Sequence, residues 1–429
     1  MIFGLDTLSL GIGYLISYLR RDGHEVKLIV ESLSFTDDDY LMRQVREFKP
    51  DACLFSCITV YYQWSLRISK KIKEEIGCKI IFGGLHVTAC PEVVKENDWI
   101  DEICIGDGIA YFGYKFDPDE VFPERKDFYD QLAPHYHVHP YMMTSFGCPY
   151  HCTYCMPAHL KITLPRRSID GCIRELKELK RMGAKRMFIW DDSFTIDKKW
   201  VFAFLNRYRE EIKLPFRCVT HPKLITYDMT KKLKEAGCYL IGIGIQTGNE
   251  ELRRKVLNRY ETNDDFLKAC YIIKQFGIKL TVDHIFCLPG ETAENLQESY
   301  ELYKKAKPDL LNTFRLIYFP KSKIIDHGLA YGLLNQQDVY NIEHGIGNNY
   351  ASGEHFRVAN VNKMVNKMIA IPLGGGLWES MPDWLTKLAC YIRIGKDFLP
   401  QTIIQNQIYF RWKKVKRWFI SISGLARTR

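Results

Sequence analysis

The sequence predicts an α/β protein that has two parallel-sheet domains and a mostly helical C-terminal region. Three observations support this prediction. Strand-like apolar runs alternate with helical patterns over residues 1–112, the alternation resumes at residue 140, and it fades after residue 335. A chain of 429 residues is also too long for one hydrophobic core. We therefore expect a first domain over 1–112, a linker over 113–139, a second domain over 140–335 and an accessory region over 336–429.

The first domain is predicted to be a doubly wound, Rossmann-like sheet. Helical spacing of apolar residues predicts a helix over 10–19, and Gly23 marks its end. Further helices are expected over 38–48, 63–76 and 91–97, and strands over 24–30, 51–60, 78–84 and 102–108. Ligands of such sheets bind at the carboxyl ends of the strands. There the chain has small or polar residues, at 56–59, 83–86 and 106–108.

The second domain is predicted to hold six strands separated by helices. The strands are expected at 141–145, 186–190, 216–220, 240–246, 280–286 and 310–319. The helix over 169–183 has a clear apolar stripe and ends at Gly183. Six β/α units are fewer than the eight of a closed barrel, so we expect an open, partial (β/α)6 barrel.

The composition is typical of a soluble globular protein, with 46% hydrophobic and 26% charged residues. No stretch is long and apolar enough to span a bilayer, and the N-terminus lacks the features of a signal peptide, so we expect a cytoplasmic protein. The 14 cysteines are expected to be reduced, with most of them buried as small hydrophobes. Cys53, Cys172, Cys218 and Cys270 are examples.

The basic charge of the chain is concentrated in its tail. The net charge is +9, and no acidic residue follows Asp397. A nearly neutral body argues against a nucleic-acid partner. Residues 403–422 predict a basic amphipathic helix, whose apolar stripe is Ile404, Ile408, Trp412, Val415 and Phe419. Such a helix either lies on the inner face of a membrane, which would favour a lipid-like substrate, or packs on the barrel.

The strongest motif is a CxxxCxxC loop directly after the first strand of the second domain. Its cysteines are Cys148, Cys152 and Cys155. Three thiolates on one loop can bind three irons of a cubane and leave one iron open to a substrate with an amino and a carboxylate group. The alternative is a structural zinc site, which normally takes four ligands, and His151 is badly placed to be the fourth.

This motif and its position resemble the radical S-adenosylmethionine superfamily over residues 140–335. Further segments resemble the family in order: WDDSFT at 190–195, GIGIQTGNEELRRKVLNR at 242–259, HIFCLPGET at 284–292 and YFPKSKI at 318–324. Gln246 replaces the usual glutamate of GIESG, and Cys287 stands where glycine is commoner. By this resemblance, the residues that contact S-adenosylmethionine are Tyr154, Asp191, Asp192, Gln246, Pro289 and Gly290.

The resemblance implies a [4Fe-4S] enzyme that cleaves S-adenosylmethionine reductively to a 5′-deoxyadenosyl radical. It also implies a low-potential electron donor such as a flavodoxin or ferredoxin, and a small-molecule substrate. The protein is expected to orient the reactants and exclude water, while the cofactor performs the difficult chemistry.

The first domain resembles the cobalamin-binding domain that precedes the barrel in one branch of this superfamily. By that resemblance, the residues that line the corrin are Ser56, Thr59, Gly83, Gly84, His86, Gly106 and Gly108. The DxHxxG signature of other cobalamin enzymes is absent, so no lower histidine ligand is predicted. The usual first strand, ahead of the helix at 10–19, is expected to be missing, so that either the domain is N-terminally trimmed or the sequence starts downstream of the true start.

Three functions follow from these patterns. The main prediction is a cobalamin-dependent methyltransferase that acts on an unactivated carbon. The first alternative is a radical cyclase, dehydrogenase or rearrangement enzyme without cobalamin, and the second is a metal-binding or electron-transfer protein that is not an enzyme. The loop histidines His135, His137 and His139 are expected to be solvent-exposed rather than metal ligands.

Overall fold

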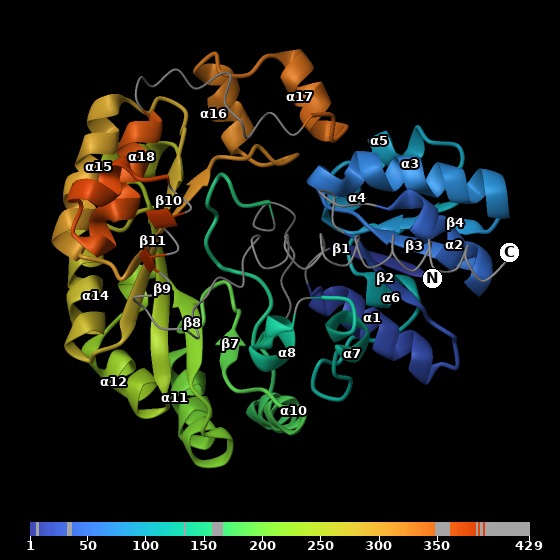
Figure 1. Ribbon diagram of the computed structural model, residues 1–429, viewed down its shortest axis with the longest axis horizontal. Coiled ribbons are helices and arrows are strands. Elements are labelled where there is room, and N and C mark those ends of the chain that lie inside the picture. The colour runs from blue at the N-terminus through green and yellow to red at the C-terminus, as the bar shows by residue number, and fades with distance from the viewer. Residues whose placement is uncertain are drawn as a thin grey trace, which may run out of the picture. The chain divides into compact units, whose positions relative to one another are not determined.

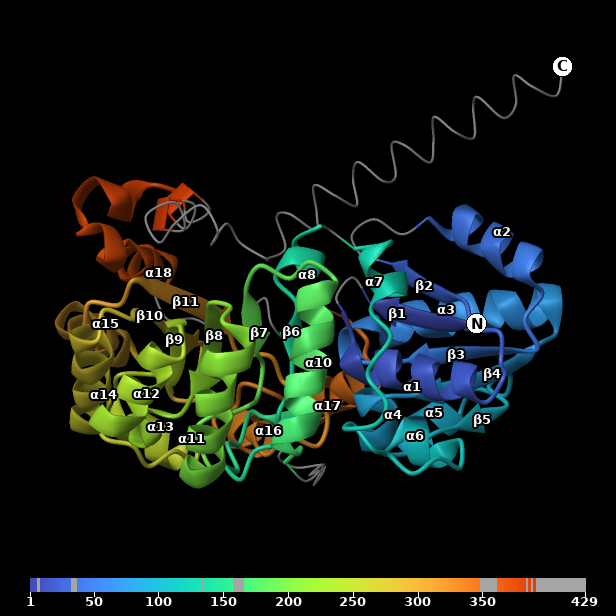
Figure 2. The same cartoon turned by 90° about the horizontal axis from the view of Figure 1, so that it is seen from below.

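The computed structural model describes residues 1–5, 8–31, 37–132, 134–156, 166–347, 361–382, 385–386 and 389–390. These residues form two compact units, shown from two directions in Figures 1 and 2. The first unit contains Met1–His137 and Glu343–Ile346, and the second contains Val138–Ile342 and the described part of Gly347–Leu399. The basic helix expected over 403–422 lies outside the described residues.

The first unit has a parallel sheet with the strand order β2-β1-β3-β4-β5. Its strands are β1 (Ile2–Leu5), β2 (Leu28–Glu31), β3 (Ala52–Ser56), β4 (Lys79–Gly83) and β5 (Glu102–Ile103). Its helices include α1 (Leu10–Arg21), α2 (Asp38–Phe48), α3 (Thr59–Ile76), α4 (Leu85–Ala89), α5 (Pro91–Lys95) and α6 (Gly108–Tyr111). Helices α1 and α3 cover opposite faces of the sheet (Figure 1), which confirms the doubly wound prediction.

The prediction that the first strand is missing is wrong. Residues Ile2–Leu5 form β1, which pairs with β2 on one side and β3 on the other. The ring of Phe3 stacks on that of Phe55, with 4.4 Å between the ring centres. The sequence pattern missed this strand because Gly4 interrupts its short apolar run and no turn signal stands before it.

The expected linker also differs from its prediction, because much of it packs on the first unit. It contains α7 (Lys126–Tyr129) and α8 (His135–Val138), and the side chain of Phe128 is completely buried. The Gln131 side chain accepts a hydrogen bond from Val30 N (3.0 Å) and donates one to Leu28 O (2.9 Å). It thereby gives hydrogen-bond partners to backbone groups of the edge strand β2.

The second unit has a sheet of six parallel strands with the order β11-β10-β9-β8-β7-β6. The strands are β6 (Tyr141–Met142), β7 (Met187–Ile189), β8 (Phe216–Thr220), β9 (Cys238–Gln246), β10 (Lys279–Phe286) and β11 (Leu310–Arg315). The helices between them are α10 (Ile169–Arg181), α11 (Lys198–Arg207), α12 (Tyr227–Glu235), α13 (Glu250–Lys255), α14 (Asn263–Gln275) and α15 (Ala293–Ala306). All six predicted strands are present, and the sheet is an open partial barrel.

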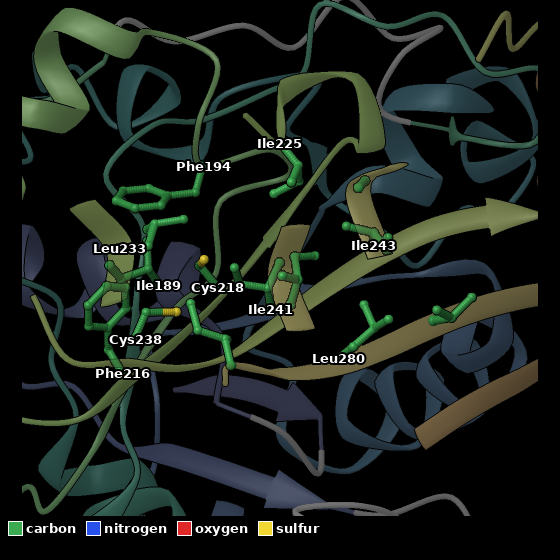
Figure 3. Packing of buried hydrophobic residues seen from close by; sticks show 14 of the residues in the cluster. Ile189, Phe194, Phe216, Cys218, Ile225, Leu233, Cys238, Ile241, Ile243 and Leu280 are labelled. Atoms are coloured by element: carbon green, nitrogen blue, oxygen red, sulfur yellow. The ribbon is translucent and has the colours of Figure 1, made fainter. Parts of the chain in front are cut away.

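The core of this unit lies between the strands and the helices outside them. Figure 3 shows Ile189, Cys218 and Ile241, from three neighbouring strands, in one packed layer with Leu233 of α12. Alternation along each strand therefore directs the remaining side chains to the inner face of the barrel. Cys53, Cys172, Cys218 and Cys270 are all buried, as predicted.

The region after the barrel contains α16 (Ile324–Ala330), α17 (Gln336–Glu343) and α18 (Val361–Ala370). Met368 and Ile369 of α18 are buried in the core of the second unit. Part of the accessory region therefore completes the barrel domain. Among the described helices, none is long and apolar enough to cross a membrane.

Candidate active site

The loop that carries the three motif cysteines follows β6 and is fastened at its start by Asp191, directly beyond β7. This carboxylate is 1% exposed and accepts hydrogen bonds from Thr144 N (2.6 Å), Thr144 Oγ1 (2.5 Å) and Ser145 Oγ (2.9 Å). Burial raises its pKa. Asp191 was predicted to contact S-adenosylmethionine, but its oxygens are used here to hold the loop.

A second set of contacts fastens the loop near its last cysteine. Thr153 N donates to Leu257 O (3.2 Å), and Thr153 Oγ1 donates to Val256 O (2.5 Å). Asn258 Nδ2 donates to His151 O (2.9 Å). The segment after α13 thus determines the course of the loop between Cys148 and Cys155.

The thiol of Cys152 is buried, while Cys148 and Cys155 are half-buried. Cys155 N donates to Cys152 O (3.1 Å), which closes a tight turn between them. Within the described ranges, no three His, Cys, Asp or Glu side chains converge as the ligands of a single ion do. A cubane binds each thiolate through a different iron, so its ligands need not share one centre. The donor set therefore fits an iron–sulfur cluster.

Arg259 lies beside this loop and was not predicted as a site residue. Its Nη1 is 3.8 Å from Cys152 Sγ and 3.4 Å from Tyr154 Oη, and its Nη2 donates to Gly244 O (2.7 Å). Burial alone would lower the pKa of the guanidinium, but Tyr154 and Glu261 beside it raise that pKa. Burial raises the pKa of Tyr154. Arg259 is therefore a permanent cation at the cysteine loop.

Gln246 ends β9 with an unusual backbone and an unsatisfied side chain. Its φ is +68°, and its side chain folds back over Gly244, where an added Cβ would lie 2.2 Å from Gln246 Nε2. Gln246 is 8% exposed, and its Oε1 has no hydrogen-bond partner among the described residues. A buried acceptor without a donor is costly, so this oxygen fits a ligand hydroxyl such as that of a ribose.

The other residues predicted to contact S-adenosylmethionine lie at the same edge of the sheet, where the parallel strands end. Asp192 is exposed after β7. Pro289 and Gly290 follow β10 in a turn, and the ring of Tyr331 packs on Gly290. The structure thus brings Tyr154, Asp192, Gln246 and this turn to one edge.

The turn after β10 is held by a buried carboxyl that was not predicted. Glu291 Oε2 accepts hydrogen bonds from Cys287 N (2.6 Å) and Leu288 N (3.3 Å). Burial raises its pKa to about 8. Cys287 adopts a φ of +69°, which explains why glycine is commoner there in the family segment that this turn resembles. Burial raises the pKa of the Cys287 thiol to about 12, so it is an inert thiol.

The carboxyl edge of the first unit holds the residues predicted to line a corrin. Gly84 has a φ of +97°, and a Cβ there would lie 2.7 Å from Cys57 O, so only glycine lets the two loops approach. Gly106 and Gly108 face open space, and Ser56 is half-buried. Gly83 is also half-buried, at the end of β4. These residues offer a backbone surface for a bulky ligand.

The side chains of Thr59 and His86, which were also predicted to line the corrin, are buried. His86 is fully buried, with Nδ1 3.2 Å from Thr59 Oγ1, and burial lowers its pKa to about 4. Its Nε2 has no hydrogen-bond partner in the described part of the chain. Residues Glu343–Ile346 pack here, since a Cβ on Gly345 would lie 2.9 Å from Thr59 O. In addition, Gln63 Nε2 donates to His344 O (2.7 Å).

The structure describes the side chains of two of the three linker histidines, His137 and His139. His137 is exposed and stacks on Tyr129, with 5.0 Å between the ring centres. His139 is half-buried, which differs from the exposed position that was expected. The side chain of His135 lies outside the described residues.

Comparison with known families agrees with the fold and the cysteine loop. Residues 142–303 match the model of the radical SAM superfamily, and residues 3–112 match that of the B12 binding domain. The two matches define an iron–sulfur enzyme that binds S-adenosylmethionine, with a cobalamin-type domain ahead of its barrel. The chain belongs to the radical SAM superfamily, in the branch that contains a B12-binding domain.

Two curated relatives match most of this chain, and a solved structure has a similar fold. An uncharacterized methyltransferase, PH0819, from Pyrococcus horikoshii is 24% identical over 78% of this chain and 81% of its own length. The anaerobic magnesium-protoporphyrin IX monomethyl ester cyclase of Rubrivivax gelatinosus is 23% identical over 70% of this chain and 62% of its own. The radical SAM methyltransferase TsrM from Kitasatospora setae, solved with tryptophan and a SAM analogue, has the same fold. Its TM-score is 0.63 at 16% identity, over 75% of this chain and 74% of TsrM.

Proposed function

We propose that this enzyme is a cobalamin-dependent methyltransferase that methylates an unactivated carbon of a small molecule. The observation that carries the proposal is the pairing of a three-cysteine loop with a B12-binding domain in one chain. When bound, the cluster supplies the electron that cleaves S-adenosylmethionine, and cobalamin supplies a carrier for the methyl group.

The residues of the chain would bind and orient these groups. Cys148, Cys152 and Cys155 would hold the cluster, and the two anchors at Asp191 and Thr153 fix the loop that carries them. Gln246 offers a buried acceptor to the ribose. Because this oxygen has no hydrogen-bond partner in the described part of the chain, ligand binding relieves an existing cost and favours a single ligand orientation.

The cobalamin surface would be formed by Ser56, Gly83, Gly84, Gly106 and Gly108. Gly106 and Gly108 have open space where a side chain would be, so backbone groups can approach the corrin there. His86 would contribute indirectly by holding Thr59. PH0819 is named a methyltransferase, and the TsrM structure is named for a radical SAM methyltransferase, which supports methyl transfer here.

A second candidate is a radical enzyme without cobalamin. The buried position of His86 and the packing of Gly345 on Thr59 favour it, since these two of the predicted corrin residues are covered. One relative of this chain, from Rubrivivax gelatinosus, is named a cyclase, which also supports this candidate.

The test is anaerobic reconstitution of the full chain with iron, sulfide and hydroxocobalamin, followed by reduction with labelled S-adenosylmethionine. Retained cobalamin, seen in the visible spectrum, and transfer of the labelled methyl group support the proposal. Release of 5′-deoxyadenosine without retained cobalamin favours the second candidate. A loaded cluster that neither cleaves S-adenosylmethionine nor transfers its methyl group indicates an electron-transfer protein instead.

Cys152→Ala should abolish both the cluster and turnover, because the loop then has only two thiolates. Cys270→Ala, in α14, is the matched control, since it removes a buried thiol elsewhere. Iron per chain and product formation measure both. A fully loaded and active Cys152→Ala enzyme would contradict the assignment of the cluster.

The proposal also includes the electron donor of the enzyme and its location in the cell. A flavodoxin or ferredoxin of low potential is the expected reductant, and the cytoplasm the expected location. The basic segment 403–422 would bind anionic membranes if it forms the amphipathic helix that its pattern predicts, which favours a lipid-like substrate. Sedimentation of the full chain with anionic vesicles, compared with neutral vesicles, tests this.

A further inference from the structure

The guanidinium of Arg259 contacts the thiol of Cys152, and several hydrogen bonds hold Arg259 in this position. Its own backbone N donates to Arg253 O (3.0 Å), and its side chain is 9% exposed. The guanidinium reaches Cys152 Sγ at 3.8 Å, so a hydrogen-bond donor with a full positive charge lies beside one cluster ligand. The position of the Arg259 side chain is fixed further by the hydrogen bond from its Nη2 to Gly244 O (2.7 Å).

Glu261 places an opposite charge on the other side of this guanidinium. Its Oε1 accepts from Arg259 Nε (2.7 Å), and its side chain is 1% exposed. Burial alone would raise the pKa of Glu261, but His221 and Arg259 lower it to about 2, so the carboxylate stays ionised. The charge pair is therefore permanent at ordinary pH.

His221 connects this pair back to the cysteine loop. Its Nε2 lies 3.2 Å from Glu261 Oε2, and its ring stacks on Tyr150, with 4.4 Å between the ring centres. Tyr150 lies between Cys148 and Cys152 in the loop. The loop is thus flanked by a buried network of His221, Glu261 and Arg259.

Charges in such a network act strongly because little water screens them. Reduction adds one electron to a cluster, so a nearby cation stabilises the reduced form and a nearby anion destabilises it. Net charge and hydrogen bonds to the sulfurs are the protein's means of setting a cluster potential. We propose that Arg259 and Glu261 are positioning residues that set the reduction potential of the cluster in opposite directions. This inference rests on the proposed function, because it requires a cluster on Cys152.

The pair has opposed roles. The Arg259 cation raises the potential toward that of the available electron donor. The Glu261 carboxylate limits this effect and fixes the guanidinium at the sulfur. Removing either charge should therefore shift the potential, with opposite signs, whereas a merely structural role would not give opposite signs.

The experiment is a redox titration of the reconstituted full chain, followed by electron paramagnetic resonance of the reduced cluster. Arg259→Gln should make the potential more negative than that of the wild type, and Glu261→Gln should make it more positive. Arg259→Lys keeps the charge and should restore most of the shift. Lys255→Gln, which removes an exposed cation of α13, is the control and should leave the potential unchanged.

Shifts of the same sign, or no shift in either glutamine variant, would overturn the inference. So would loss of the cluster in both variants, since the pair would then serve to hold the loop. An Arg259→Lys enzyme that behaves like Arg259→Gln would show that geometry rather than charge matters. Failure of the wild type to assemble any reducible cluster overturns the proposed function itself, and is thereby distinguished from these results.

Discussion

At the scale of single residues, Cys287 shows how a local backbone conformation decides which side chain is tolerated. Its φ of +69° is favourable only for glycine. Cys287→Gly should therefore be more stable than Cys287→Ala by about 1 kcal/mol, because both lose the thiol and only glycine relieves the strain. Urea unfolding of the two variants measures the difference.

Cys270 provides the control for this order of stability. It lies inside α14 and is equally buried, so there alanine should be more stable than glycine by about 1 kcal/mol. The same order at both positions would show that residue 287 is not strained.

Glu291 makes the stability of the enzyme depend on pH. Burial raises its folded-state pKa to about 8, from an ordinary value of 4.5. The unfolded chain therefore releases this proton at lower pH than the folded chain, so the carboxyl's contribution to stability is full below pH 4.5 and is lost as the pH rises through 8.

Glu291→Gln removes this titration. Relative to the wild type, the variant should gain up to about 1.4 kcal/mol of stability for each pH unit between pH 5 and pH 8. Urea unfolding at several pH values measures the gain. A constant difference between the two proteins across this range would mean that Glu291 titrates normally.

At the scale of elements, Asp191 joins the end of β7 to the start of the cysteine loop. Asp191→Ala leaves Thr144 N and two hydroxyls without their acceptor, and this should cost about 2–4 kcal/mol and reduce iron loading. Its neighbour Asp192 is exposed, so Asp192→Ala should change stability by less than about 0.5 kcal/mol. Equal unfolding midpoints for the two variants would contradict the anchoring role.

Gly84 joins two loops at the edge of the first unit. Gly84→Ala should destabilise that unit by about 2–4 kcal/mol, from backbone strain and from overlap with Cys57. Gly108→Ala, which faces open space, should be nearly neutral. Thermal unfolding with and without cobalamin compares the stability of the two variants. Equal losses of stability would contradict the close approach of Gly84 to Cys57.

The sequence predicted these elements well where their patterns were long. The helix at 38–48 was predicted with its observed bounds, and so was the strand at 216–220, because both have a clear period and clear end signals. Strand β1 was missed because Gly4 interrupts its short apolar run and no turn signal stands before it. The helices α7 and α8 of the expected linker were missed because each has only four residues, too few to show a helical period. Gln131 makes contacts that no periodicity reveals.

At the scale of the whole molecule, the candidate site could be predicted only in part. The cysteine motif and the family-like segments located the loop, Gln246 and the turn after β10. The roles of Asp191 and Arg259 were not predictable, because they depend on partners 47 and 107 residues away in the chain. His86 was expected at a ligand surface, and its complete burial depends on how Tyr62 and Thr59 pack around it.

The return of Glu343–Ile346 to the first unit has a practical consequence for dividing this protein. The peptide that completes the neighbourhood of Thr59 is encoded some two hundred residues downstream of the rest of that unit. A fragment ending at His137 would present Thr59 and Gln63 without their natural cover, and Glu96 would lose the imidazole 3.3 Å from its Oε2. Cobalamin binding measured on such a fragment would therefore describe a different surface from that of the intact enzyme.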